Sequence, residues 1–228
     1  MTERTDAEPR GPIRAVFFDI GGVLTSGPWE SFARYERESD LPDGLIRRIN
    51  STNPDANAWA RFEKGEVDVA GFAEAFRAEA LAMGFDLDPH AILASLRGET
   101  CVEMVEAARF CRSRYKTAAL TNNFVPTGAS ERQGISGLFD GLFDAVIESS
   151  KVGLRKPDRR FYEMACATVA VEPTEAVFLD DLGINLKPAR AMGMYTIKVV
   201  DPRDAVAELY SVLGVSPDGW TPPVTEPA

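Results

Sequence analysis

Hydrophobic and polar positions alternate in two different ways along this chain, and the change predicts two structural units. The mostly apolar runs that are typical of strands buried on both faces lie at 14–20, 116–121, 145–148, 176–180 and 195–200. A helical pattern follows each of the last three runs. Strands that alternate with helices predict right-handed crossovers and a mostly parallel sheet with helices on both faces.

The stretch between the first two runs has a different pattern. Helical spacing begins at Pro28 and again at Pro42, Asp68 stands at an N-cap position, and Asp88-Pro89 begins a further helix. No strand-like run occurs there, so the pattern predicts an all-helical insertion.

Together these patterns predict the fold class α/β, with a Rossmann-like three-layer parallel-sheet core and an inserted all-helical cap domain. The predicted boundaries are 13–26 and 114–215 for the core, 27–113 for the cap, and 1–12 and 216–228 for flexible termini rich in proline and polar residues.

Composition excludes several classes of protein. The three cysteines are an odd number without Cys-x-x-Cys spacing, which excludes a disulfide framework or a cysteine metal cluster, and the single histidine, His90, fits the first turn of a helix. A formal net charge of −10 without a basic stripe argues against nucleic-acid binding. No apolar run spans a bilayer and no signal-peptide pattern begins the chain, so we expect a cytoplasmic protein without a membrane partner.

Polar side chains follow four of the predicted strands at the points where they end. Asp19 ends the first strand, Thr121 and Asn122 end the second, Lys156 follows the third, and Asp180-Asp181 ends the fourth. Taken alone, each has an ordinary explanation as a turn former, a helix cap or a surface charge. Their order at successive strand ends is not explained in that way, because ligands bind outside the carboxyl ends of parallel strands.

Three aspartates in one crevice would repel each other unless a cation were present. Mg²⁺ fits such a site, since it takes oxygen ligands and keeps water and substrate phosphate in its shell. Lys156 would add positive charge, while Thr121 and the amides around Asn122 would hold phosphate oxygens.

These residues resemble the four motifs of the haloacid dehalogenase superfamily. The motifs are Phe18-Asp19-Ile20-Gly21-Gly22-Val23, Leu120-Thr121-Asn122, Lys156-Pro157 and Phe178-Leu179-Asp180-Asp181, and the similarity spans residues 13–213. The stretches 147–157 and 180–193 are similar to the N-terminal phosphatase domain of soluble epoxide hydrolases and to the related domain fused to some acyl-CoA dehydrogenases.

The resemblance implies a role for each site residue. Asp19 would be the nucleophile that forms an aspartyl-phosphate. Asp19, the Gly21 carbonyl and Asp181 would ligate Mg²⁺, with Asp180 and Asn185 supporting that set of ligands. The phosphoryl group would be bound and stabilised by Thr121, Asn122 and Lys156.

One position departs from the family pattern. Most phosphatases of this family carry an acidic residue two positions after the nucleophile, and here that position is Gly21. Either the leaving group needs little protonation, as in an acyl or anomeric phosphate, or a cap residue among Glu63, Lys64 and Glu66 supplies the proton. The third alternative is a weak or inactive phosphatase that binds phosphorylated ligands.

The favoured function is a phosphatase acting on a small phosphorylated metabolite, as a monomer or a homodimer. The cap would wall the pocket, with Trp29, Trp59, Phe62 and Phe72 as candidates for that wall, although aromatic residues at helical spacing commonly pack a core. Carbon–halogen cleavage would leave Asp180-Asp181 unexplained. Carbon–phosphorus cleavage would require Lys64 as a Schiff base.

Overall fold

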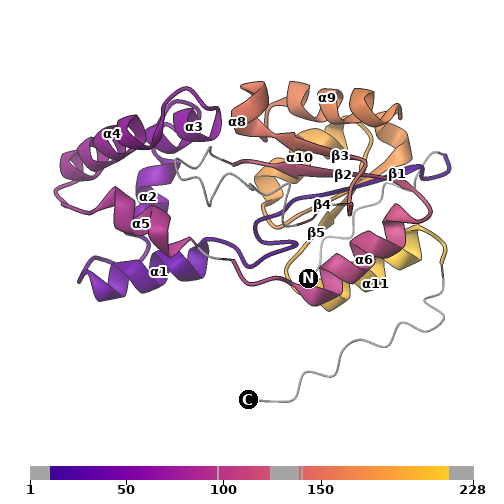
Figure 1. Ribbon diagram of the computed structural model, residues 1–228, viewed down its shortest axis with the longest axis horizontal. Helices are drawn as coiled ribbons and strands as arrows, with labels where there is room; N and C mark the ends of the chain where they lie inside the picture. The colour runs from indigo at the N-terminus through magenta and orange to yellow at the C-terminus, as the bar shows by residue number, and fades with distance from the viewer. Residues whose placement is uncertain (1–10, 97, 124–138, 140, 216–228) are drawn as a thin grey trace, which may run out of the picture.

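The computed structural model describes residues 11–96, 98–123, 139 and 141–215 (Figure 1). Within these residues a parallel sheet has the strand order β3-β2-β1-β4-β5. The strands are β1 (Ala15–Phe18), β2 (Lys116–Thr121), β3 (Ala145–Glu148), β4 (Ala176–Asp180) and β5 (Tyr195–Lys198). The predicted α/β class with a parallel sheet is confirmed, and the predicted first and last strands are shorter than expected.

Alternate residues of the strands face two different helical layers. Val16 and Phe18 pack with α6 (Val102–Arg112) and α11 (Pro202–Val212) on one face of the sheet. Ala15 and Phe17 pack with α9 (Arg159–Val169) and α10 (Gly183–Ala191) on the other face. All four β1 side chains are fully buried, which explains why this strand is apolar throughout. Figure 1 shows α9 and the α6–α11 pair on opposite sides of the sheet.

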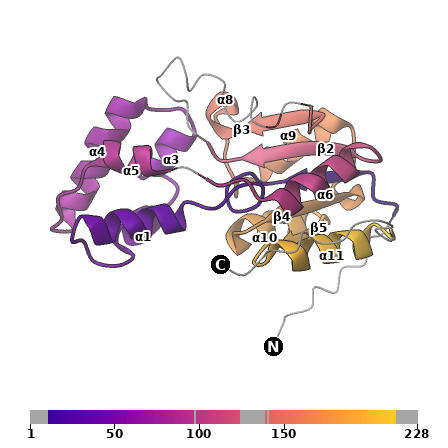
Figure 2. The ribbon, with the colours of Figure 1, turned by 60° about the horizontal axis from the view of Figure 1, so that its bottom comes forward.

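A second apolar cluster lies among the inserted helices, beside the sheet (Figure 2). These helices are α1 (Trp29–Glu38), α2 (Leu45–Ser51), α3 (Ala58–Glu63), α4 (Val69–Ala82) and α5 (Pro89–Ser95). Phe72 is at its centre, stacked on Phe62 with ring centroids 4.5 Å apart and on Phe76 at 5.3 Å. The predicted N-caps Asp68 and Asp88 accept hydrogen bonds from the amides of Gly71 and His90.

Helix α6 belongs to the core, although the predicted cap range 27–113 includes it. Its buried side chains Met104, Ala107, Ala108 and Cys111 pack in the cluster that contains β1 and β2 residues. The side chains of the cap cluster extend only to Leu96. The cap boundary therefore moves toward the N-terminus, because helical spacing shows that a helix has an apolar face but does not show which core that face covers.

Two connectors join the cap to the core and are bonded to each other. Thr25 and Thr100 form an antiparallel bridge. The Ser26 amide donates to the Glu99 carbonyl at 2.8 Å, and the Cys101 amide donates to the Leu24 carbonyl at 2.9 Å. The insertion therefore leaves and re-enters the core at one place.

Two predictions concern the remaining parts of the chain. Residues 1–10 and 216–228, which make up most of the predicted flexible termini, lie outside the described residues. Among the helices that are described, none has the length and apolar character needed to cross a bilayer.

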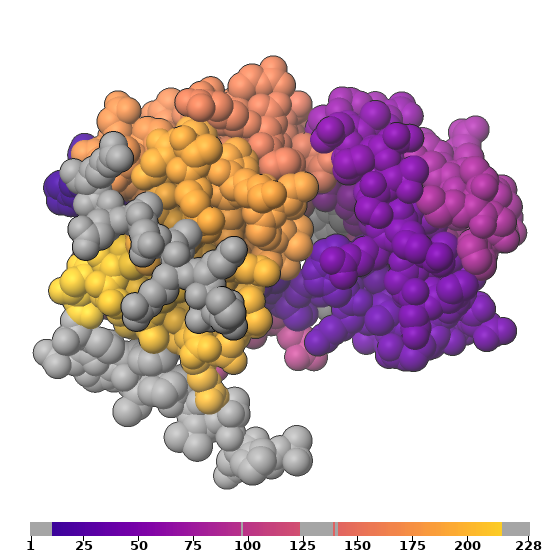
Figure 3. Space-filling model, turned by 180° about the vertical axis from the view of Figure 1, so that it is seen from behind, coloured from indigo at the N-terminus to yellow at the C-terminus, as the bar shows by residue number. Residues whose placement is uncertain are grey.

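The loop after α3 lies directly against the core segment that begins α8 (Ser149–Val152). Figure 3 shows the cap and this part of the core in contact. Gly65 has φ +68°, and a Cβ there would lie 2.6 Å from the Ser150 carbonyl oxygen. Only a residue without a side chain fits this approach.

We expect Gly65→Ala to destabilise the protein through both backbone strain and this clash. Gly44→Ala is the matched control, since Gly44 has φ +73° but nothing within 4 Å of its Cβ position. The control should lose about 1 kcal/mol from left-handed strain alone, and Gly65→Ala at least about 1 kcal/mol more. Urea unfolding of both variants measures the difference, and equal losses would contradict the clash.

Candidate active site

The sheet brings the predicted site residues to one edge. Phe18 is in register with Leu179 of β4 and Ala119 of β2, so the next residue, Asp19, lies beside the ends of both neighbouring strands. One ligand atom from each of Asp19, Asp180 and Asp181 lies within 4.8 Å of the others. Three carboxylates at this spacing form a potential cation site.

The Lys156 ammonium lies between two of these carboxylates. Its Nζ is 2.8 Å from Asp19 Oδ1 and 2.8 Å from Asp180 Oδ2, and the side chain is only 1% exposed. Burial alone would lower the pKa of Lys156, but the two carboxylates outweigh burial and raise it. The lysine is therefore held in its charged form beside Asp19.

Asp180 is fully buried and both of its oxygens are used inside the protein. Oδ1 accepts hydrogen bonds from the Leu182 amide at 2.8 Å and from the Asn185 side chain at 3.0 Å, while Oδ2 faces Lys156. The Tyr162 hydroxyl in turn donates to the Asn185 carbonyl at 2.7 Å. The carboxylate of Asp180 thus orients Lys156 and the loop before α10, and Asn185 holds that carboxylate in place.

Asp19 is nearly buried and, like Asp180, contacts the Lys156 ammonium. Its Oδ1 accepts the Ile20 amide at 2.7 Å in addition to the Lys156 contact. Burial raises the pKa of the Asp19 carboxyl well above its usual value; Lys156 opposes this effect, and Asp180 and Asp181 add to it. A bound divalent cation would act in the opposite direction and favour the ionised form.

The Asp181 carboxylate lies against the turn that follows β1. A Cβ at Gly22 would meet the Asp181 carboxyl carbon at 2.5 Å. Burial raises the pKa of Asp181, whereas a hydrogen bond from the Trp29 side chain lowers it. Trp29 begins the cap, so the cap reaches Asp181 directly.

Gly21 occupies a turn whose hydrogen bonds use other residues. The Gly22 amide donates to Thr25, and the Thr25 amide donates to Ile20. A Cβ at Gly21 would meet nothing within 4 Å. Position 21 therefore has no side chain that could donate a proton, but it has space for one.

Thr121 and Asn122 follow β2 in different environments. Thr121 is buried at the end of the strand, opposite Glu148. The Asn122 side chain accepts the Lys156 amide at 2.8 Å and donates to the Lys156 carbonyl at 3.0 Å. The side-chain amide of Asn122 therefore holds the loop that contains Lys156, in which the Lys156–Pro157 peptide is cis. Because this amide is bonded to the main chain of Lys156, it is not directed at a free phosphate site.

A buried ion pair at the cap–core junction was not predicted from the sequence. The Glu63 carboxylate lies 3.0 Å from the Trp59 indole nitrogen and 2.8 Å from Arg155 Nε. Burial raises the pKa of Glu63, and Arg155 opposes this shift. The Glu63 carbonyl also accepts the Ser149 hydroxyl at 2.6 Å. The only sequence signal is that Arg155 directly precedes Lys156.

The other proposed proton donors in the cap are engaged with each other. Lys64 Nζ is 2.7 Å from a Glu66 oxygen. Of the proposed wall aromatics, Phe62 and Phe72 are buried in the cap core and Trp59 packs edge-on against Phe72, whereas Trp29 is 39% exposed.

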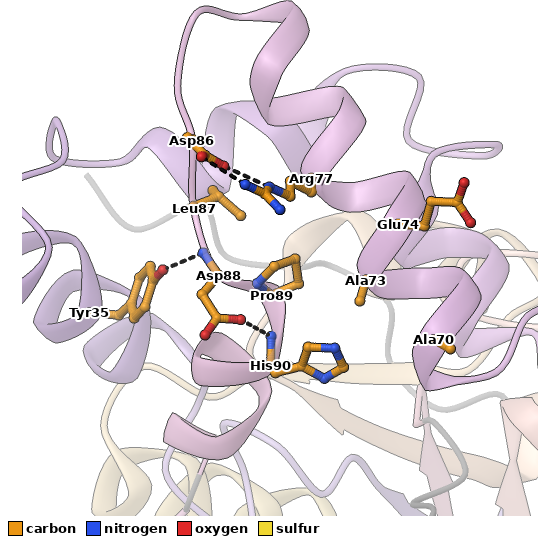
Figure 4. A pocket seen from close by; sticks show the side chains of 10 residues that line it. All are labelled: Tyr35, Ala70, Ala73, Glu74, Arg77, Asp86, Leu87, Asp88, Pro89 and His90. Atoms are coloured by element: carbon orange, nitrogen blue, oxygen red, sulfur yellow. Dashed lines mark hydrogen bonds and ion pairs between the residues drawn. The ribbon is translucent and has the colours of Figure 1, made fainter.

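A separate cavity of about 610 Å³ lies on the cap between α4 and the start of α5 (Figure 4). Arg77 and Asp86 form a two-bond ion pair in its lining, and the Asp88 amide donates to the Tyr35 hydroxyl. None of the aspartates of the cation site lines this cavity. The cavity is therefore not part of the strand-end site.

Comparisons with known proteins identify the class to which this fold and site belong. The haloacid dehalogenase-like hydrolase family matches residues 13–193. The chain belongs to this family of hydrolases.

Relatives in other organisms agree with this assignment. The chain is 36% identical to mouse acyl-CoA dehydrogenase family member 10 over 207 residues, and 34% identical to pig bifunctional epoxide hydrolase 2 over 218 residues. These matches cover 88% and 89% of this chain but only 19% and 39% of those proteins. A phosphatase of Mycobacterium tuberculosis, MT3486, is 34% identical to this chain. The match covers 92% of this chain and 99% of that phosphatase.

Solved structures share the fold. A HAD-like hydrolase from Porphyromonas gingivalis aligns with a TM-score of 0.62 at 21% identity, covering 87% of this chain and 98% of that one. A HAD family enzyme from Bacteroides thetaiotaomicron, in complex with magnesium and inorganic phosphate, aligns with a TM-score of 0.57 at 19% identity, covering 82% of this chain and 93% of that one.

Removing the buried ammonium should destabilise the folded protein in a pH-dependent way. We expect Lys156→Met to cost about 3–5 kcal/mol at pH 7, because Asp19 and Asp180 are left uncompensated. The raised folded pKa of Asp19 rises further without Lys156, so the folded state binds a proton more readily than the unfolded state. The loss should therefore shrink as the pH falls below the folded pKa of Asp19.

Urea unfolding at pH 7 and pH 5 in the presence of a chelator measures this effect. Lys151→Met is the control, since Lys151 is 62% exposed in its ion pair with Glu148. A penalty for Lys156→Met that is independent of pH would show that packing, and not charge, accounts for the loss.

Proposed function

We propose that this chain is a magnesium-dependent phosphatase that acts on a small phosphorylated metabolite through an aspartyl-phosphate on Asp19. The observation that carries the proposal is the charged Lys156 held 2.8 Å from Asp19 beside the carboxylate cluster. This arrangement keeps a carboxylate nucleophile and a phosphate-binding cation together at the open end of the sheet.

The donor set fits Mg²⁺. All its candidate ligands are oxygen atoms. Burial is the main cause of the raised pKa of Asp19 and of Asp181, and the neighbouring carboxylates raise it further; a cation would neutralise that carboxylate charge. Asp19, the Gly21 carbonyl and Asp181 would hold the ion. Asp180, whose oxygens already accept bonds from Lys156, Asn185 and Leu182, would support it from behind. When bound, Mg²⁺ would offset the charge of the substrate phosphate.

In the proposed reaction, a carboxylate oxygen of Asp19 attacks phosphorus and the bond from phosphorus to the leaving-group oxygen breaks. Water then hydrolyses the aspartyl-phosphate, which releases inorganic phosphate and restores Asp19. Lys156 and the Thr121 hydroxyl would stabilise charge on the phosphoryl oxygens. Asn122 would act indirectly, because its side chain holds the main chain of Lys156.

The relatives support this reaction class. The Mycobacterium tuberculosis relative of nearly the same length is named a phosphatase, and the Bacteroides thetaiotaomicron enzyme with the same fold was crystallised with magnesium and phosphate. We extend both properties to this chain because Asp19, Lys156, Asp180 and Asp181 lie together at the carboxyl ends of the strands.

Gly21 favours substrates whose leaving group needs no acid. Sugar-1-phosphates and acyl phosphates are such substrates, because their leaving groups are already stabilised. The same residue favours the second candidate function, a phosphate-ligand-binding protein with weak or no turnover. Carbon–phosphorus cleavage is not favoured, because its required Lys64 is paired with Glu66.

The first experiment measures phosphate release across sugar-1-phosphates, acyl phosphates, ordinary phosphomonoesters and p-nitrophenyl phosphate. We expect release that requires Mg²⁺ and falls to background in Asp19→Asn, because the amide cannot form the phosphoenzyme. If no substrate is turned over while phosphorylated ligands still bind, the chain is a binding protein and the catalytic proposal fails.

We further expect Gly21→Asp to raise activity on substrates with poor leaving groups. The new side chain has space, and general acid catalysis contributes typically about 10²–10⁴-fold, of which an engineered acid should recover at least about tenfold. The rate with p-nitrophenyl phosphate should change much less. Gly21→Asn, which has the same shape but no acidic proton, is the matched control, and an equal gain in both variants would contradict an acid role.

A further inference from the structure

We propose that Trp29 and Arg47 of the cap form a binding site for a second oxyanion, carried by the leaving-group part of the substrate. This inference rests on the proposed phosphatase function and deepens it. The substrate class it names is a phosphorylated metabolite that also carries a carboxylate or a second phosphate.

Trp29 connects this site to the catalytic aspartates. It is the first residue of α1, and its side chain lies near enough to Asp181 to lower the pKa of that carboxyl. The preceding turn is packed on the site as well, because a Cβ at Gly27 would lie 3.4 Å from Trp29 Cδ1 and 3.6 Å from the Gly22 Cα. The indole thus lies beside the turn that contacts a candidate metal ligand.

Part of Trp29 is exposed to solvent. Trp29 is 39% exposed, in contrast to Phe62 and Phe72, which are buried in the cap core. An exposed aromatic ring beside a phosphate site offers an apolar face on which the body of a substrate can lie.

Arg47 supplies the charge. Its guanidinium carbon lies 5.5 Å from the centre of the Trp29 ring, and the residue is exposed on α2. Within the described residues no carboxylate lies within ion-pair distance of Arg47, although the chain carries 35 acidic residues. A guanidinium over an indole is held by a cation–π interaction that uses none of its N–H donors, which can still bind a carboxylate or phosphate.

The geometry sets the distance between the two anions of the substrate. One indole separates the Asp181 carboxylate from the Arg47 guanidinium. A substrate whose phosphate lies at Asp19 and whose body covers the ring would place a distal oxyanion near Arg47. A short, rigid aromatic phosphate with a carboxylate at its far end is therefore a suitable probe.

The test compares 4-carboxyphenyl phosphate with its neutral analogue of similar shape, 4-carbamoylphenyl phosphate, in the full chain with Mg²⁺. We expect the wild type to favour the carboxylate probe in kcat/KM by about five- to tenfold, and Arg47→Gln to reduce this ratio to about one. Arg48→Gln, at an exposed arginine of the same helix, should retain the wild-type ratio. Trp29→Leu should reduce kcat/KM for both probes, because both lose the ring.

A ratio that is unchanged in Arg47→Gln, or that falls equally in Arg48→Gln, overturns the proposal. If the wild type turns over neither probe, the phosphatase proposal fails for these substrates, and the site is tested by binding. Calorimetry with 4-carboxybenzylphosphonate and 4-carbamoylbenzylphosphonate should then show the same Arg47-dependent preference. Equal affinities of the wild type for the two phosphonates overturn the second-oxyanion site.

Discussion

The buried ammonium of Lys156 is the contact on which the rest of the site depends. It lies within 2.8 Å of both Asp19 and Asp180, in a place where an unpaired charge would cost several kcal/mol. The surrounding hydrogen bonds make this arrangement sustainable. Asn122 fixes the main chain of the lysine, and Asn185 holds Asp180 from behind. Asp19, the Lys156 ammonium and their supports therefore form one network that spans three strand ends.

The cap contributes to this network at two places. Trp29 lies near Asp181 at the start of the cap, and the Glu63–Arg155 pair closes the junction on the other side. Arg155 and Lys156 are neighbours in sequence, so one short loop carries both the residue that holds the cap and the residue that holds Asp19. Docking of the cap and placement of the lysine are thereby mechanically connected.

The parallel sheet and the convergence of Asp19, Lys156 and Asp180 could be predicted from the sequence, because the hydrophobic pattern of a strand and the residues at its end are local properties. It did not show that α6 packs on the sheet, since helical spacing identifies an apolar face but not its partner. It also could not show which aromatic residues were buried: Trp29 and Phe72 have the same spacing signal but different exposure. The Glu63–Arg155 pair joins residues far apart in sequence, and no periodicity encodes such a contact.

The paired connectors at Thr25 and Thr100 restrict how the cap can move. Because the two strands of chain are bonded to each other, any motion that preserves these bonds is a rotation of the whole cap about a single hinge. In Figure 1 the contact between α3 and α8 lies away from that hinge. The Glu63–Arg155 side is consequently the edge at which such a flap would open. Opening at that edge would then involve the loss of a contact one residue away from the lysine that holds Asp19.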